Sequence, residues 1–364
     1  MSVPTDTIWE IDPHTKAKHE ILHRYLGAWF GIMGPRNKKI IYLDGFCGPG
    51  CYKNGEPGSP IIALKIAHDH YSNDRINKAT FIFIDENADR LSCLKEEIRR
   101  LGSCPSDFDI IVVQNQFEDT LSNVLDEIEK KGSTIAPTFA FIDPFGFKGA
   151  PYELIRKLLQ NSKTEIFINI MVDSINRFLE HPNQQITNHI IDLFGTEEVL
   201  EIINGEGNRV EELINLYQKQ ISKIAKYVRF FKMRDKNNRP IYCLFFATNN
   251  RLGHLKMKEA FWRVDHDSGY EFSDATNPDQ MVLFEKDHSK DLADKITEKF
   301  GNREVSVKVI RIFVEDDTAY TSSQMKKSLT FLENNDLISV KEIKINGGKR
   351  RKGTFPDDVV INFR

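Results

Sequence analysis

Short apolar runs alternate with amphipathic segments along the first half of the chain. The runs are rich in β-branched and aromatic residues, which is typical of buried parallel strands. They lie at residues 40–44, 79–87, 108–116, 138–146 and 164–173. The segments between them are amphipathic or open with helix-start residues, which indicates helices. This alternation predicts an α/β fold, a parallel sheet whose successive strands are joined by right-handed helical crossovers.

A helix is predicted before the first strand, and a helical insertion after the fifth. Residues 14–33 place apolar side chains on one helical face. Residues 174–226 are helical and polar, with a weak break at 204–208. Two further strands, at 227–235 and 241–250, are separated by a turn-rich link so short that we expect them to pair as antiparallel neighbours.

The carboxy-terminal part of the chain has a different character. After a helix at 251–267 and a mixed linker at 268–291, we expect helices and then two strands about a turn at 347–348. Helices followed by a basic β-hairpin outline a winged helix. We therefore expect an α/β domain at 1–285, with its helical insertion at about 174–226, and a winged-helix domain at 290–364.

Composition limits the classes of function. The chain has 364 residues and a formal net charge of −3, so any binding of nucleic acid must be local. No apolar run approaches the roughly 20 residues that span a membrane, and the amino terminus lacks the pattern of a signal peptide. The scattered cysteines favour reduced thiols in a cytoplasmic protein. Cys47 and Cys51 have no second pair to complete a metal site, so we expect no metal.

The loop after the first strand is the stretch around which the sheet is organised. Asp44 ends that strand, and Gly45, Gly48 and Gly50 follow it. Glycine lets the backbone turn sharply and approach a ligand closely. Ser59 is expected to cap the next helix. A strand, an acid, a glycine loop and a helix in this order hold nucleotide-like cofactors in doubly wound α/β domains.

Polar residues also end the next predicted strands. Asp85 and Glu86 follow the second strand, Asn115 the third and Asp143 the fourth. Because the carboxyl ends of parallel strands share one edge of a sheet, these residues should converge with the glycine loop. Carboxylates accept hydrogen bonds from ribose hydroxyls, so Asp85 and Glu86 suit that role. The alternative for Asp85 is to cap the next helix.

The sequence Asp143-Pro144-Phe145-Gly146 is the most specific of these motifs. An exocyclic amine on a base is a poor nucleophile, because its lone pair is delocalised into the ring. The carboxylate of Asp143 and the carbonyl of Pro144 can accept hydrogen bonds from its two N–H groups. This favours a pyramidal nitrogen aimed at a methyl donor. Phe145 would stack on a base turned out of its helix. The alternative is a turn in which Asp-Pro only ends the strand.

These motifs resemble those of class I S-adenosylmethionine-dependent methyltransferases. Their sheets, too, end in an antiparallel hairpin, and residues 143–146 resemble the D/N-P-P-Y/F motif of enzymes that methylate nucleic-acid amino groups, in the variant of tRNA guanine-N2 methyltransferases. The resemblance implies S-adenosylmethionine as cofactor. The residues that it implies for donor binding are Lys18, Asp44, Gly45, Phe46, Gly48, Gly50, Asp85, Glu86, Asn115 and Phe117.

A closer resemblance covers about residues 12–275. The segments at 14–30, 42–60, 141–149 and 246–265 together resemble the three-Cys-motif partner (TcmP) family. That family is named for the cysteines of its genomic partner, a radical-SAM-like protein, which the resemblance implies as a partner here. The glycine loop is longer than the usual methyltransferase turn. Weaker candidates for contact with donor or substrate are His14, Lys16, His19, Lys53, Glu56, Asn169 and Asp173.

A basic hairpin near the carboxy terminus is the strongest sign of nucleic-acid binding. Its cations are Lys344, Lys349, Arg350, Arg351 and Lys352. Cations at the tip of a wing can contact phosphates, and the helix that starts at about residue 321 would then be the recognition helix. The alternative is a solvated turn on a small protein-docking domain.

The expected function is therefore methyl transfer from S-adenosylmethionine to an exocyclic amino group of a base in RNA or DNA. A second hypothesis is a catalytically inactive module with the same fold, which directs a partner protein or nucleic acid to a defence or mobile-element complex. A third is a metal-dependent nuclease, in which Asp44, Asp85 and Asp143 share a metal ion.

Overall fold

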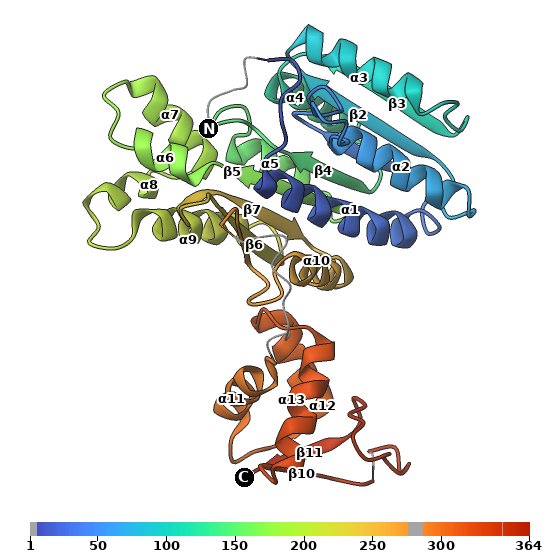
Figure 1. The fold of residues 1–364 in the computed structure, drawn as a ribbon, viewed down its shortest axis with the longest axis vertical. Coiled ribbons are helices and arrows are strands. Elements are labelled where there is room, and N and C mark those ends of the chain that lie inside the picture. Colours follow the sequence, from blue (N-terminus) through green and yellow to red (C-terminus); the bar gives the residue numbers. More distant parts are fainter. Residues whose placement is uncertain (1–5, 276–286, 344) are drawn as a thin grey trace. The chain divides into compact units, whose positions relative to one another are not determined.

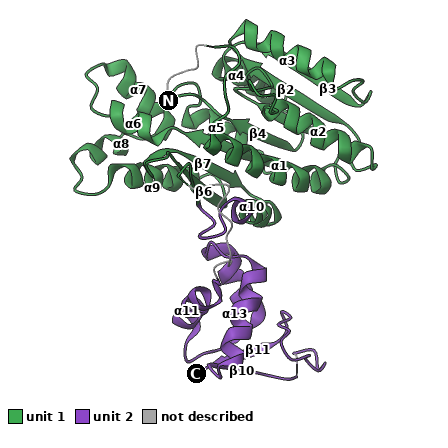
Figure 2. Ribbon diagram, in the orientation of Figure 1, with its two compact units in different colours: residues 1–260, 271–278 green, residues 261–270, 279–364 purple. Residues whose placement is uncertain are grey.

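The chain forms two compact units, green and purple in Figure 2. The first holds Met1–Ala260 and Glu271–Pro278, and the second Phe261–Tyr270 and Asp279–Arg364. The computed structural model describes residues 6–275, 287–343 and 345–364. In these ranges, no helix combines the length and the apolar composition needed to cross a membrane.

Within the described residues, an eight-stranded sheet runs through the first unit in the order β3-β2-β1-β4-β5-β7-β6-β8. Strands β1 to β5 pair in parallel, and β7 is antiparallel to β5 and β6. A parallel sheet that ends in such a hairpin is the class I methyltransferase arrangement, so the predicted fold class is confirmed. The strands are β1 (Ile40–Asp44), β2 (Ala79–Asp85), β3 (Phe108–Gln114), β4 (Thr138–Ile142), β5 (Thr164–Ile170), β6 (Tyr227–Arg234), β7 (Pro240–Thr248) and β8 (Glu271–Ser273).

Helices cover both faces of this sheet (Figure 1). The helices among the first five strands are α1 (Pro13–Met33), α2 (Ser59–Tyr71), α3 (Ala88–Arg100), α4 (Phe117–Lys130) and α5 (Tyr152–Leu159). Tyr25 and Trp29 of α1 pack on Phe139 of β4, with ring centroids 5.3 and 5.9 Å apart. Ala140 and Ile142 of β4 belong instead to a core cluster with residues of α4 and α5. Because side chains alternate along a strand, these two residues face the side of the sheet opposite to Phe139.

More helices lie between β5 and β6. They are α6 (Val172–Phe178), α7 (Gln184–Phe194), α8 (Glu198–Glu201), the 3-10 turn η1 (Ile202–Asn204) and α9 (Arg209–Ile221). Their apolar residues join the same core cluster as α4 and α5. Helix α10 (Arg251–Val264) follows β7.

Two local predictions were wrong. Ser59 does not cap α2: Gly58 is the cap residue, and its N–H donates to the carbonyl of Gly50 over 2.7 Å. The predicted linker at 268–291 contains β8, which pairs in parallel with β6 at the edge of the sheet. Strand β8 is only three residues long, which is too short to leave a periodic pattern in the sequence.

The second unit has a winged-helix fold, as predicted. In its described residues, three antiparallel strands, in the order β10-β11-β9, accompany helices that share one apolar core. The predicted turn at 347–348 lies in the connection between β10 and β11. Within this connection, Ile343 and Lys349 form an isolated antiparallel β-bridge. The elements are α11 (Ser289–Phe300), β9 (Glu304–Ser306), α12 (Val307–Ile312), the π-helical turn η2 (Phe313–Asp317), α13 (Ser322–Asn334), β10 (Ile338–Val340) and β11 (Val360–Phe363).

Candidate functional site

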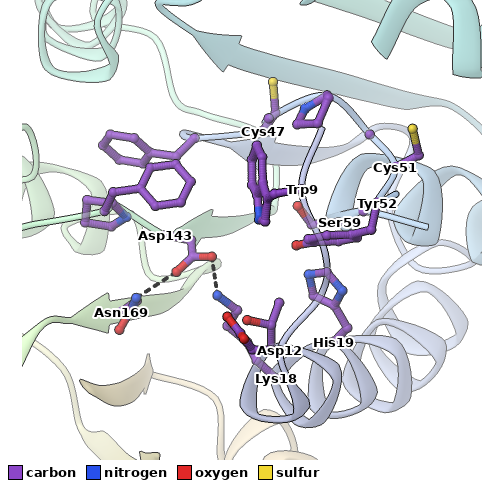
Figure 3. Close-up of a pocket in the computed structure, with 18 of the residues that line it drawn as sticks. Trp9, Asp12, Lys18, His19, Cys47, Cys51, Tyr52, Ser59, Asp143 and Asn169 are labelled. Carbon is purple, nitrogen blue, oxygen red and sulfur yellow. Dashed lines mark hydrogen bonds and ion pairs between the residues drawn. The ribbon is translucent and has the colours of Figure 1, made fainter. Parts of the chain in front are cut away.

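A cavity of about 250 Å³ opens in the first unit at the carboxyl ends of β1, β4 and β5 (Figure 3). The glycine loop, the start of α1 and the residues that precede α1 complete its wall. Parallel pairing of β1 with β4 and of β4 with β5 brings these strand ends together. The predicted site residues that line the cavity are Lys18, Phe46, Gly48, Gly50, Asp143, Pro144 and Phe145.

Asp143 is held by two donors from different elements. The ammonium of Lys18, in the buried face of α1, forms an ion pair with Oδ2 of Asp143. The amide Nδ2 of Asn169, in β5, donates to Oδ1 over 2.8 Å. Because a carboxylate accepts about four hydrogen bonds, Asp143 keeps lone pairs for a ligand. Lys18, which the resemblance assigned to the donor, is instead engaged with Asp143.

Asp44 ends the neighbouring strand but is not among the residues that line the cavity. Its side chain is fully buried and accepts a hydrogen bond from the hydroxyl of Tyr42 over 3.2 Å. Burial raises the pKa of Asp44 to about 7, although hydrogen bonds from Ser59 and Tyr42 act in the opposite direction. The Ser59 hydroxyl thus serves Asp44 instead of capping α2.

Asp85 supports the glycine loop. Its carboxylate accepts from the N–H of Gly48 over 3.1 Å and from the N–H of Asn87 over 2.8 Å. It does not cap α3, because Asn87 accepts from the first N–H groups of that helix. The side chain of Asp85 is buried, so its role is to fix the loop in place.

The remaining predicted donor residues lie outside the cavity wall. Glu86 and Asn115 are exposed at the ends of β2 and β3. Phe117 is buried and packs on Gly45, where an added Cβ would come within 2.6 Å of its ring. Its ring centroid is also 5.5 Å from that of Phe46, which does line the cavity.

Phe145 lines the cavity, but two other side chains already contact its ring. The Trp9 and Phe145 rings meet edge to face, with centroids 5.9 Å apart and an interplanar angle of 74°. The guanidinium of Arg90, in α3, lies over the Phe145 ring at 5.4 Å and over the Trp9 ring at 5.1 Å. The sequence analysis missed Trp9 and Arg90, because neither adjoins a strand end and only the fold brings them to Phe145.

Two polar side chains from α1 and the glycine loop also line the cavity. His19 and Tyr52 are in ring contact, with centroids 5.6 Å apart. Burial lowers the pKa of His19 to about 3, so its imidazole is neutral at physiological pH. Burial likewise raises the pKa of Tyr52, so its hydroxyl keeps its proton.

The other weak candidates serve the protein itself. His14 Nδ1 lies 2.7 Å from the carboxylate of Asp274, and Lys16 forms an ion pair with Glu56 over 3.0 Å. Lys53 is exposed, and Asp173 pairs with Arg177 on α6.

No metal centre is formed by the described part of the chain: it holds no cluster of three or more His, Cys, Asp or Glu side chains that could bind an ion. Asp44, Asp85 and Asp143 lie in separate environments, so the geometry gives no support to the nuclease hypothesis. Cys47 is buried and Cys51 half-buried, and both are free thiols.

The wing of the second unit carries both exposed and engaged cations. Lys349, Arg351 and Lys352 are exposed. The side chain of Arg350 is only 5% exposed and pairs with Glu333 of α13. It is therefore not the free cation that was expected to contact phosphate. Lys344 lies outside the described residues. At the start of α13, Thr321 and Gln324 form a capping box, while Ser323, Lys326 and Lys327 are exposed.

Residues 271–342 match the family model described as a GMT-like wHTH domain. This match agrees with the winged-helix fold of the second unit. The sequence has no significant match among curated proteins.

Several solved structures share part of the fold at low identity. Spermidine synthase from Thermotoga maritima is 12% identical, with 66% of this chain and 61% of that chain covered and a TM-score of 0.32. Trm1 from Pyrococcus horikoshii, solved with S-adenosyl-L-methionine, is 13% identical, with 72% and 61% covered and a TM-score of 0.36. Precorrin-6y C5,15-methyltransferase from Geobacter metallireducens is 8% identical, with 62% and 87% covered and a TM-score of 0.28. The chain thus spans about three fifths of the length of the first two.

Proposed function

We propose that this chain is an S-adenosylmethionine-dependent methyltransferase that acts on an exocyclic amino group of a nucleic-acid base. The observation that carries the proposal is the carboxylate of Asp143, held between Lys18 and Asn169 in the wall of a cavity that the glycine loop also lines. A carboxylate fixed in this way can accept a hydrogen bond from an N–H of the target amine without first reorganising.

The chemistry of the amine requires this placement. The carboxylate of Asp143 and the carbonyl of Pro144 would accept hydrogen bonds from the two N–H groups of the amine. The nitrogen lone pair then points out of the plane of the base and toward the methyl donor. Lys18 compensates the charge of Asp143, and Asn169 orients it. S-adenosylmethionine, when bound, supplies an electrophilic methyl group on a sulfonium.

The glycine loop leaves room for a donor at Gly48, whereas an added Cβ at Gly50 would meet Leu94 at 2.7 Å. Gly48 and Gly50 have φ angles of +62° and +80°, which favour glycine. An added Cβ at Gly48 would have Trp9, 3.8 Å away, as its nearest neighbour, so the loop leaves room on that side. We propose that this loop and Phe46 contact the donor.

The other predicted donor residues take two different roles in this proposal. Glu86 and Asn115 are exposed at adjacent strand ends, and we propose that they reach the ribose and adenine of the donor. Asp44, Gly45, Asp85 and Phe117 would act indirectly, by fixing the loop.

We also propose that the winged helix binds the nucleic acid. The match to a GMT-like wHTH domain and the exposed cations Lys349, Arg351 and Lys352 support this. The functional division would then follow the sequence boundaries, with the catalytic domain at 1–285 and the winged helix at 290–364.

Transfer of a labelled methyl group tests the proposal directly. The full chain is incubated with S-adenosylmethionine labelled in the methyl group and with total RNA or genomic DNA, and the nucleosides are then separated. Label on an amino group in one pool, absent with Asp143→Ala, is the expected result. Wild-type chain that transfers no label to either pool would overturn it.

A second candidate is a non-catalytic module of the TcmP type with a radical-SAM-like partner. It is favoured by one observation: Phe145, the expected base-stacking residue, is already covered by Trp9 and Arg90. It predicts binding of S-adenosylhomocysteine, measured by calorimetry, without methyl transfer to either pool. Cleavage of nucleic acid that needs magnesium and no donor would instead indicate the nuclease.

A further inference from the structure

The residues before α1 form a strap along the cavity. Residues 6–12 form neither helix nor strand. The N–H of Lys53, in the glycine loop, donates to the carbonyl of Trp9 over 2.9 Å. The Trp9 side chain lies beside Tyr52 of the glycine loop (Figure 3), with ring centroids 5.9 Å apart. Its ring also contacts that of Phe145, again with centroids 5.9 Å apart.

The cavity that the strap borders is small for the proposed reaction. The cavity of about 250 Å³ falls below the roughly 300–1,000 Å³ of small-molecule sites, and here it must admit both a donor and a base. Aromatic rings in contact, whether offset-stacked or edge-to-face, have centroids about 4.5–7 Å apart. The Trp9 ring meets the Phe145 ring within this range at an interplanar angle of 74°, and the Arg90 guanidinium lies over the Phe145 ring, so both compete with a base for contact with Phe145.

The two groups that cover Phe145 differ in how readily they can leave. Arg90 is buried and belongs to α3, whose start is fixed by Asn87. Trp9 belongs to a segment without regular secondary structure and is half-buried. Moving Arg90 would disturb a helix, whereas moving Trp9 breaks one backbone hydrogen bond to the glycine loop and a set of ring contacts.

We propose that Trp9 occupies the seat of the target base, so that the strap keeps the site closed until a base displaces the indole. Arg90 then stacks on the base, as guanidinium planes do on unstacked bases in RNA complexes. The inference rests on the proposed function and adds a built-in control of access to it. It also resolves the conflict between Asp143, which is ready to accept an amine, and Phe145, which is covered.

Methyl transfer by Trp9→Ala tests the inference. If the closed form must open before the base binds, removal of the indole lowers the KM for nucleic acid by about fivefold to tenfold and leaves the affinity for S-adenosylhomocysteine unchanged. A Trp9→Ala variant with a raised KM would show that the indole forms a wall of the base site, which overturns the inference. Wild-type chain without any transfer would instead overturn the proposed function.

Tryptophan fluorescence gives a second readout that a structural role would not produce. The measurement uses the full chain with Trp262→Phe, which removes the signal of the second unit, and adds RNA or DNA in the presence of S-adenosylhomocysteine. We expect a change that persists with Trp29→Phe, since Trp29 is buried on α1, and that disappears with Trp9→Phe. A change that survives Trp9→Phe would show that the indole stays in place.

Discussion

Asp44 and Asp143 end neighbouring parallel strands and have opposite environments. Asp44 is fully buried, and burial raises its pKa to about 7. Asp143 lies in the cavity wall with a cation on one oxygen and an amide on the other. The two acids differ by one residue in their position relative to the end of the strand. Asp44 is the last residue of β1, whereas Asp143 is the first residue after β4.

An acid at the end of a strand therefore indicates a site only where its side chain lies in the wall of a cavity. An ionised carboxylate in an apolar interior is costly unless a cation or several donors compensate it. Lys18 provides that charge for Asp143, while Asp44 has only hydroxyl and backbone donors. Asp44 is therefore enclosed by groups of the protein itself, whereas Asp143 keeps acceptor positions that a ligand can use.

Asp143→Asn is expected to have the largest effect. An amide in place of the carboxylate weakens the acceptor for the amine and leaves Lys18 uncompensated, so the rate of methyl transfer should fall by about 100- to 1,000-fold. The measurement is the initial rate with labelled donor, with circular dichroism to confirm folding. Asp44→Asn is the matched control, and equal losses in both variants would break the contrast between the two acids.

The pH dependence of stability sharpens the contrast from the other side. Asp44 has its pKa raised from 3.8 to about 7, so between these values the native state holds a proton that the unfolded state has released. Stability from the neutral carboxyl is complete below about pH 4 and is lost as the pH rises through 7, by up to about 4 kcal/mol. Urea unfolding at pH 5 and pH 8 should show this fall in the wild type and not in Asp44→Asn. A fall of equal size in Asp44→Asn would refute the assignment.

Lys18→Met should destabilise the first unit by about 3 kcal/mol, because it leaves the carboxylate of Asp143 in a largely buried pair without its cation. In Lys18→Met/Asp143→Leu both charges are gone, so the double variant should lose less stability than the sum of the single variants. Urea midpoints of the wild type and the three variants measure this coupling. Strict additivity would show that the two side chains do not depend on each other.

The wing repeats the contrast between a free and an engaged charge, with a smaller expected effect. Lys349→Gln or Arg351→Gln should reduce the slope of log affinity against log salt by about 0.7 to 0.9 each, for single-stranded or duplex nucleic acid. Arg350→Gln should leave that slope unchanged and instead destabilise the winged helix, because Arg350 pairs with Glu333. Filter binding over a range of salt concentrations makes the comparison. Equal slopes for all three variants and the wild type would argue against phosphate contact by the wing.

The fold could be predicted because its signals are local. Alternating strands and helices determine which strand ends share an edge, and this brought the glycine loop and Asp143 to one cavity. The long-range partners of these residues could not be predicted. Nothing near Lys18 in the sequence indicates Asp143, and Asp85 turns back to Gly48 rather than outward to a ligand. Trp9 reaches Phe145 only because residues 6–12 fold back along the loop.

The central claim is that the donor lies in the cavity beside Asp143. A crystal structure of the full chain with S-adenosylhomocysteine and a short oligonucleotide tests it most directly. We expect the ligand sulfur beside the glycine loop, a base amino nitrogen about 3 Å from a carboxylate oxygen of Asp143, and Trp9 displaced from Phe145. Ligand bound outside this cavity would contradict the account, if the cavity stays closed and the hydrogen bond from Asn169 to Asp143 is unchanged.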